Sequence, residues 1–145
     1  MASVQNNEAL ALLHEFHFPL CLVHNESVGE VPSVYVDNVK AGWDVADFLI
    51  TSGHHRLGMI AGQFHASDRA KQRYAGFQRR IQQDEFARLE VLIEVDPNDV
   101  TPFALCDITA KDTAPTAWFC SNDLLALKLI NHFHLQGLSV PGIAR

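Results

Sequence analysis

Polar side chains that can bind a ligand follow three apolar stretches, at the points where helices should begin. These places are Asp37–Asn38, the segment 62–73 with Ser67 and Asp68, and the segment 121–123. Arg73 stands inside the second of these helices. Hydroxyl, amide and carboxylate groups exchange hydrogen bonds with small polar molecules. A guanidinium adds forked N–H donors that can hold a hydroxyl or a carboxylate group. These residue types therefore indicate a site for a small polar ligand.

Purely structural roles explain the same residues. Ser67, Asp68, Asn122 and Asp123 belong to the residue types that most often cap the N-termini of helices. Arg73 can instead lay its apolar stem along the helix surface and keep its charge in water. Residue type and spacing leave both interpretations open at each of these positions.

No spacing in the chain predicts a metal or cofactor site. Of the eight histidines, His54 and His55 are adjacent and His132 and His134 are two apart, neither of which matches the i, i+4 spacing of paired zinc ligands. The three cysteines form no CxxC pair, so we expect reduced thiols. Glycine-rich phosphate motifs and a G-x-S-x-G motif are missing as well. We therefore expect no metal, no cofactor and no catalytic residue, and hence not an enzyme.

Composition limits the partners. The chain has 145 residues and a formal net charge of -6, with 48% hydrophobic and 19% charged residues. This size and balance suit one domain or two small lobes. An acidic chain does not by itself grip a phosphate backbone. No apolar run approaches the ~18–20 residues that span a bilayer, and no signal peptide is indicated. We expect a cytoplasmic protein with no membrane contact.

Short apolar strands alternate with helical patterns. Strands are expected at 19–23, 33–36, 56–61, 89–95 and 117–120, and helices at 8–16, 38–52, 68–82, 101–110 and 123–136, the last capped by Asp123. The alternation predicts an α/β fold with parallel sheets, whose ligands bind beyond the carboxyl ends of the strands. Leu124, Leu127 and Leu135 lie off the inward face of the last helix. That helix is therefore either deeply buried or part of a subunit contact.

Five motifs stand in a fixed order between residues 34 and 141. They are VYVDN at 34–38, LITSGHHRLGMIAG at 49–62, RYAGF at 73–77, PTAWFCSNDLLAL at 115–127 and GLSVP at 137–141. Together, in this order and with this spacing, they closely resemble the lactose-repressor (LacI/GalR) family of transcription regulators. The resemblance implies a periplasmic-binding-protein-like type I fold, an α/β core of two lobes around a ligand cleft, incomplete in this chain.

The resemblance also implies a domain organisation and a set of effector contacts. Residues 1–62 would be part of the N-terminal, DNA-proximal lobe, and residues 63–145 part of the C-terminal, distal lobe. Arg73 and Asn122 match cleft positions that bind the effector, and Asp123 matches the helix-capping aspartate beside them. Ser67 or Asp68 would lie at the rim of the cleft. His24 and Asn25 would face them from the other lobe, where the family often has an aspartate.

The function implied by the resemblance is sensory. A sugar or related small polar metabolite would bind in the cleft and, in a homodimer, alter the affinity for DNA. DNA contact would need a helix-turn-helix segment, which this sequence does not contain. The alternative is a free-standing sugar- or solute-binding protein of the same fold.

Overall fold

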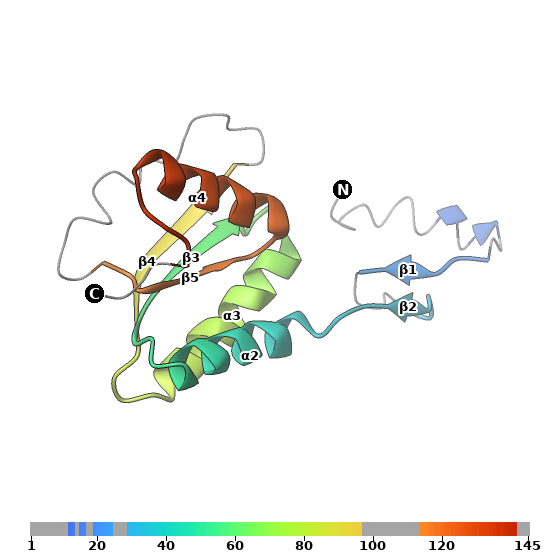
Figure 1. Ribbon diagram of the computed structural model, residues 1–145. Helices are drawn as coiled ribbons and strands as arrows, with labels where there is room; N and C mark the ends of the chain where they lie inside the picture. The colour runs from blue at the N-terminus through green and yellow to red at the C-terminus, as the bar shows by residue number, and fades with distance from the viewer. Residues whose placement is uncertain (1–11, 14, 17–18, 25–28, 97–113, 142–145) are drawn as a thin grey trace. The chain divides into compact units, whose positions relative to one another are not determined.

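Strand β3 (Arg56–Gly62) is the middle strand of a parallel sheet in the larger of two units into which the chain divides, residues 38–145. It pairs with β4 (Arg88–Val95) on one side and β5 (Ala117–Cys120) on the other. The helices of this unit are α2 (Asn38–Thr51), α3 (Asp68–Gln82) and α4 (Asp123–Leu135). Figure 1 shows α2 and α3 on one face of the sheet and α4 on the other. The computed structural model describes residues 12–13, 15–16, 19–24, 29–96 and 114–141.

The smaller unit, residues 1–37, contains the parallel pair β1 (Leu22–Val23) and β2 (Ser33–Val34). Its backbone N–H groups at Leu22 and His24 donate to the carbonyls of Pro32 and Val34, each at 2.8 Å. The two strands predicted here are therefore confirmed, although both are shorter than expected. The predicted helix 8–16 lies largely outside the described residues, and the predicted helix 101–110 lies wholly outside them.

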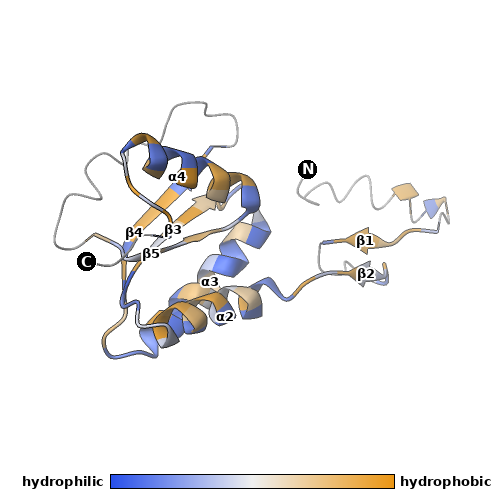
Figure 2. Cartoon of the chain, in the orientation of Figure 1, coloured by the Kyte–Doolittle hydropathy of each residue, from blue (hydrophilic) through white to orange (hydrophobic). Residues whose placement is uncertain are grey.

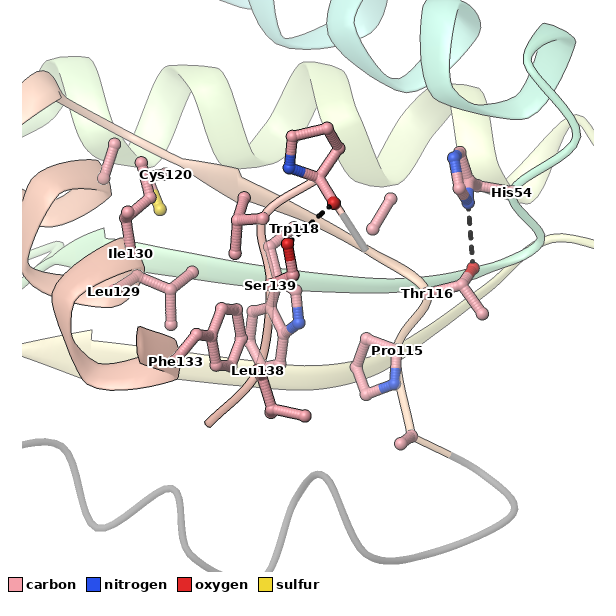
Figure 3. A pocket seen from close by; sticks show the side chains of 15 residues that line it. His54, Pro115, Thr116, Trp118, Cys120, Leu129, Ile130, Phe133, Leu138 and Ser139 are labelled. Carbon is pink, nitrogen blue, oxygen red and sulfur yellow. Dashed lines mark hydrogen bonds between the residues drawn. The ribbon is translucent and has the colours of Figure 1, made fainter. Parts of the chain in front are cut away.

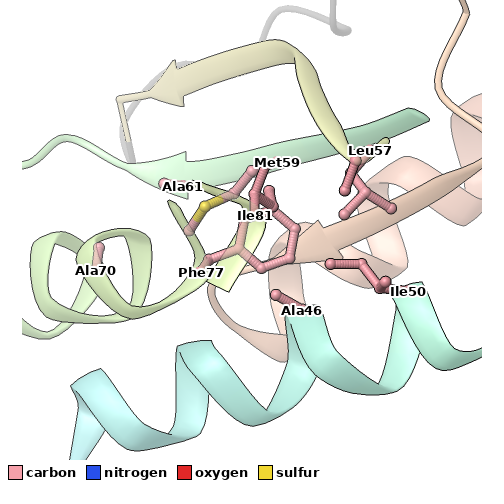
Figure 4. Close-up of a cluster of buried hydrophobic side chains, with 9 residues drawn as sticks. Ala46, Ile50, Leu57, Met59, Ala61, Ala70, Phe77 and Ile81 are labelled. Carbon is pink, nitrogen blue, oxygen red and sulfur yellow. The ribbon is translucent and has the colours of Figure 1, made fainter. Parts of the chain in front are cut away.

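Side chains of β3 point alternately to the two faces of the sheet, and each face has its own apolar layer. Leu57, Met59 and Ala61 are fully buried against the side of the sheet that α2 and α3 cover, around Phe77 (Figure 4). Ile60 points to the opposite side and packs with Leu125 and Leu129 of α4. Figure 2 shows the strands coloured mainly as hydrophobic and the helices with mixed faces. The predicted α/β class with parallel sheets is confirmed.

Helices α2 and α3 touch through their backbones at two glycines. A Cβ atom on Gly42 would lie 1.9 Å from the carbonyl oxygen of Arg73, and one on Gly76 would lie 1.8 Å from the carbonyl oxygen of Val39. Real Cβ atoms never come so close to backbone, so only glycine fits at either position. The contact at Gly42 places the main chain of Arg73 against α2, and Gly42 lies one turn after the first residue of α2.

The chain divides between Asp37 and Asn38, whereas the resemblance places the lobe boundary after residue 62. Two contacts join residues 38–62 to the C-terminal part of the chain. Strand β3 forms its parallel ladders with β4 and β5, and α2 packs on α3. The segment that begins at Asn38 therefore folds with the later strands, and the division found in the chain lies 25 residues before the expected one.

Two inward faces differ in detail from the periodicity of the sequence. Helical spacing puts Val39 on the apolar stripe of α2 with residues 42, 43, 46, 49 and 50, yet Val39 is 38% exposed and Asn38 is buried at the helix start. The same spacing puts Ile130 on the inward stripe of α4 with residues 125, 126, 129 and 133, yet Ile130 is 36% exposed and His132 is buried. None of the helices within the described residues is long and apolar enough to cross a membrane.

Candidate functional site

Arg73 ties three strand-to-helix junctions together. Its Nε–H donates to Oδ1 of Asn38 at 2.9 Å, at the first residue of α2. Its Nη1 donates to the backbone carbonyl of Ser121, the residue that follows β5. Asn38 and Ser121 are both buried, at 5% and 4% exposure, and Arg73 is half-buried. Of the two interpretations of Arg73, the one with its charge in water alone is therefore wrong, because the guanidinium is anchored to buried acceptors.

Ser121 joins the carboxyl ends of β3 and β5. Its backbone N–H donates to the carbonyl of Ile60 at 2.8 Å, which continues the β3–β5 ladder by one residue. Its hydroxyl accepts from the backbone N–H of Gly62 at 3.2 Å. Sequence reasoning placed Asn38 and Ser121 at strand-to-helix junctions where a ligand could bind, but it named neither residue among the effector contacts. The sequence feature that could have indicated Ser121 is a hydroxyl residue directly after an apolar strand.

Asn122, and not Asp123, is the N-cap of α4. The side-chain oxygen of Asn122 accepts from the backbone N–H of Leu125 at 2.9 Å, and extended backbone at Asn122 leads into the helix. Oδ1 of Asp123 accepts from the N–H of Leu124 at 2.9 Å, within the first turn. The expectation that Asp123 caps the helix is therefore wrong by one residue. Both side chains are exposed next to Ser121, and the amide nitrogen of Asn122 donates to no described residue.

The N-terminus of α3 stands at the same edge of the sheet. Ser67 is its N-cap and accepts from the backbone N–H of Ala70 at 3.2 Å, while Asp68 is exposed in the first turn. The loop before it is held by Glu94, whose carboxylate accepts from the backbone N–H of Phe64 at 2.9 Å. Phe64 stacks on Tyr74 with ring centroids 5.0 Å apart. Sequence reasoning missed Glu94 and Phe64, because their pairing depends on the β3–β4 register.

The residues expected on the opposite lobe belong to the smaller unit. His24 directly follows β1, is exposed, and has a left-handed backbone with φ of 67°. Asn25 lies outside the described residues. The structure thus brings together Arg73, Asn122, Asp123 and the start of α3 on one edge, and it describes His24 separately.

Among the described residues, Arg73 forms no ion pair with a carboxylate. The ion pairs found there join Lys40 to Asp44 and Arg80 to Asp47 and Asp84. The acceptors that hold Arg73 are a neutral amide and a neutral carbonyl, so its positive charge is not compensated by them. Arginine in this state attracts oxygen acceptors such as hydroxyl or carboxylate groups. Across the described residues, no three His, Cys, Asp or Glu side chains gather closely enough to hold a metal ion.

An apolar cavity of about 550 Å³ lies elsewhere, between β5, α4 and residues 138–141 (Figure 3). Trp118, Leu129 and Phe133 form much of its lining, and Arg73 does not contribute to it. At one end, Nδ1 of His54 and the hydroxyl of Thr116 are hydrogen-bonded at 3.1 Å. Few polar groups reach this cavity, so it does not offer the chemistry of the Arg73 edge.

Cys120 lines this cavity, and burial raises the pKa of its thiol to about 11. Only a thiolate reacts readily with alkylating reagents. At pH 8, iodoacetamide should therefore label exposed Cys21 about tenfold or more faster than Cys120, as read by mass spectrometry of the separate peptides. Unfolding in urea removes the burial and should bring the two rates together. Equal rates in the folded chain would show that Cys120 is not shielded.

The chain has parallel α/β layers with polar side chains at the carboxyl edge of the sheet, the edge at which ligands bind in open α/β folds. The sequence pattern of the periplasmic binding protein-like domain matches residues 46–143. The chain belongs to this family, and it is similar to part of the core of lactose-repressor-type regulators. Among its relatives, the HTH-type transcriptional repressor PurR of Vibrio campbellii is 34% identical over 109 residues, covering 73% of this chain and 32% of the relative.

Three further proteins are similar to this chain. The HTH-type transcriptional repressor CytR of Escherichia coli K12 is 30% identical over 118 residues, covering 77% of this chain and 33% of the relative. A solved LacI-family regulator from Burkhoderia phymatum is 29% identical, with a TM-score of 0.71 over 91% of this chain and 49% of that one. A transcription regulator from Lactobacillus plantarum shares the fold, with 20% identity and a TM-score of 0.75 over 94% of this chain and 52% of that one. The chain thus spans about a third of these curated relatives.

Proposed function

We propose that this chain is the effector-sensing part of a lactose-repressor-type transcription regulator, with a sugar or similar small polar metabolite as its effector. The anchored guanidinium of Arg73 supports this best, because it presents donors that the protein does not use at the carboxyl edge of the sheet. Asn122 adds amide donors beside it, and Asp68 adds an exposed carboxylate at a helix start. Such a mixture of donors and acceptors suits a molecule with several hydroxyl groups.

In this proposal His24 and Asn25 are further effector contacts, as the family resemblance implies. An effector favours the state of the protein that it binds more tightly, by its difference in affinity for the two states. In a dimer this shift would change DNA affinity through a DNA-binding segment outside this chain. The protein would act in the cytoplasm, without enzymatic activity, metal or cofactor.

The name of one solved structure of the same fold points to the same class of ligand. A structure of 20% identity and TM-score 0.70, from Escherichia coli, is described as a sugar-binding transcriptional regulator of the LacI family complexed with phosphate. We therefore take neutral monosaccharides as the first probes. A sugar held at about a hundred times its dissociation constant adds about 2.7 kcal/mol to the free energy of unfolding.

The proposal is tested by thermal unfolding of the regulator with D-ribose, D-glucose and D-galactose, each at about 10 mM, which is about a hundredfold excess over a dissociation constant of about 0.1 mM. At least one sugar should raise the melting temperature by several degrees. If none does, these three sugars are excluded as effectors. Sequencing the open reading frame upstream of Met1 separates the two function classes. A helix-turn-helix there supports a regulator, and a signal peptide supports the alternative, a free-standing solute-binding protein.

We also propose that the regulator is a homodimer that uses the outer face of α4. Leu124, Leu127 and Leu135 on this face are 68%, 64% and 76% exposed. Burying such leucines between two copies would be favourable by roughly 1.5–3 kcal/mol for each side chain. Leu127→Glu should therefore lower the sedimentation mass to that of a monomer, whereas Lys71→Glu on exposed α3 surface should leave it unchanged. An unchanged mass for Leu127→Glu removes α4 from the interface.

A further inference from the structure

We propose that Asn38 is a positioning residue that sets the direction of the Arg73 guanidinium at the effector site. This inference rests on the proposed function, since it assigns Arg73 to a ligand. It adds a residue that motif matching treats only as the start of a helix. The observation behind it is a buried amide whose oxygen lies 2.9 Å from Nε of Arg73, on a different helix.

The glycine contact between the two helices makes this bond possible. Because Gly42 has no side chain, the carbonyl of Arg73 approaches its backbone, and Asn38 lies one turn nearer the start of α2. Side chains on a helix lean toward its N-terminus. The long arginine stem can therefore run from the helix contact toward the start of α3 and place its guanidinium where Asn38 and the carbonyl of Ser121 meet it.

Two acceptors on separate elements fix a planar group in one orientation. Asn38 takes the Nε–H and Ser121 takes one N–H of Nη1, so the guanidinium can neither turn about its last bond nor shift along the helix. The N–H groups of Nη2 form no hydrogen bond to a described residue. These donors then keep a constant direction before any ligand arrives, which reduces the ordering that binding would otherwise require.

The neutral character of Asn38 matters as well as its shape. An aspartate in its place would supply the same acceptor geometry but would compensate the charge of Arg73. An amide leaves that charge available to the ligand while still satisfying Nε–H. The geometry therefore assigns Asn38 two effects on the same guanidinium, a fixed orientation and an uncompensated charge. A ligand at this position should present an oxygen acceptor to Arg73.

The first experiment needs no ligand. In ¹H–¹⁵N spectra of the purified chain, with the Arg73 Nε–H signal assigned through Arg73→Lys, this proton should exchange with water more slowly than that of exposed Arg79. Asn38→Ala should speed the exchange about tenfold or more, the expectation for a lost buried hydrogen bond. Asn38→Asp should restore slow exchange, and Asn131→Ala on exposed α4 surface should change nothing. Unchanged exchange in folded Asn38→Ala overturns the proposal.

The second experiment uses D-ribose, or whichever of the three sugars stabilises the regulator, as the probe. Asn38→Ala should raise its dissociation constant about tenfold or more, as expected when an ordered donor is lost, and Asn131→Ala should not. Wild-type affinity in Asn38→Ala overturns the role of Asn38 at the site. If none of the three sugars binds the wild type, these sugars are excluded as effectors, while the exchange measurement still decides whether Asn38 orients Arg73.

Discussion

Gly76→Ala should destabilise the larger unit by about 3 kcal/mol or more, the upper end of what overpacking a close contact costs. The added Cβ would lie 1.8 Å from the carbonyl oxygen of Val39 and 2.9 Å from the backbone nitrogen of Trp43. Both neighbours are helix backbone, so they cannot turn aside as a side chain would. The better helix propensity of alanine returns only about 1 kcal/mol. Urea unfolding followed by circular dichroism measures the difference.

Gly62→Ala is the matched control for this prediction. A Cβ atom added to Gly62 would have no neighbouring atom within 4 Å, and the φ of Gly62 lies outside the left-handed region. The same substitution there should change the free energy of unfolding by less than about 1 kcal/mol, the usual range for unstrained positions. A Gly76→Ala variant as stable as Gly62→Ala would mean that α2 and α3 do not touch through their backbones.

The elements of the larger unit could be predicted because their signals are local. The apolar run 117–120 is bounded by polar residues, and β5 occupies the same residues. The sequence offered Ser67 and Asp68 as N-caps of α3, and Ser67 is the N-cap. Capping and periodicity act over a few residues, so one sequence is enough to find them.

The site could be predicted only in part, because its geometry depends on residues far apart in the chain. Residue type and spacing left the role of Arg73 open, and only the family resemblance assigned it to a ligand contact. Its two acceptors lie 35 and 48 residues away. No local pattern links Arg73 to Ser121 before the order β4-β3-β5 is known. The division of the chain at residue 37 has the same origin, since it follows from strand pairing across the expected boundary.

Arg73→Ala should weaken effector binding by roughly 30-fold or more, because losing a hydrogen-bonding charged group at a binding site costs ~2–5 kcal/mol. The variant should also be less stable without any ligand. The substitution removes one donor from Oδ1 of Asn38 and one from the carbonyl of Ser121, both of them buried residues, and each lost hydrogen bond costs about 0.5–1.5 kcal/mol. Sequence patterns alone would have predicted an intact fold for this variant.

Arg73→Lys separates the two effects. A lysine ammonium keeps the charge but lacks the forked planar donors, so it can satisfy one of the two acceptors and cannot also hold a ligand in the same geometry. It should recover part of the stability lost in Arg73→Ala while effector binding stays weak. Arg79→Ala, on exposed surface of the same helix, should match the wild type in both. Calorimetric titration with the stabilising sugar and thermal unfolding give the two readouts. Wild-type affinity in Arg73→Ala would reduce Arg73 to a structural tie between α2, α3 and the end of β5.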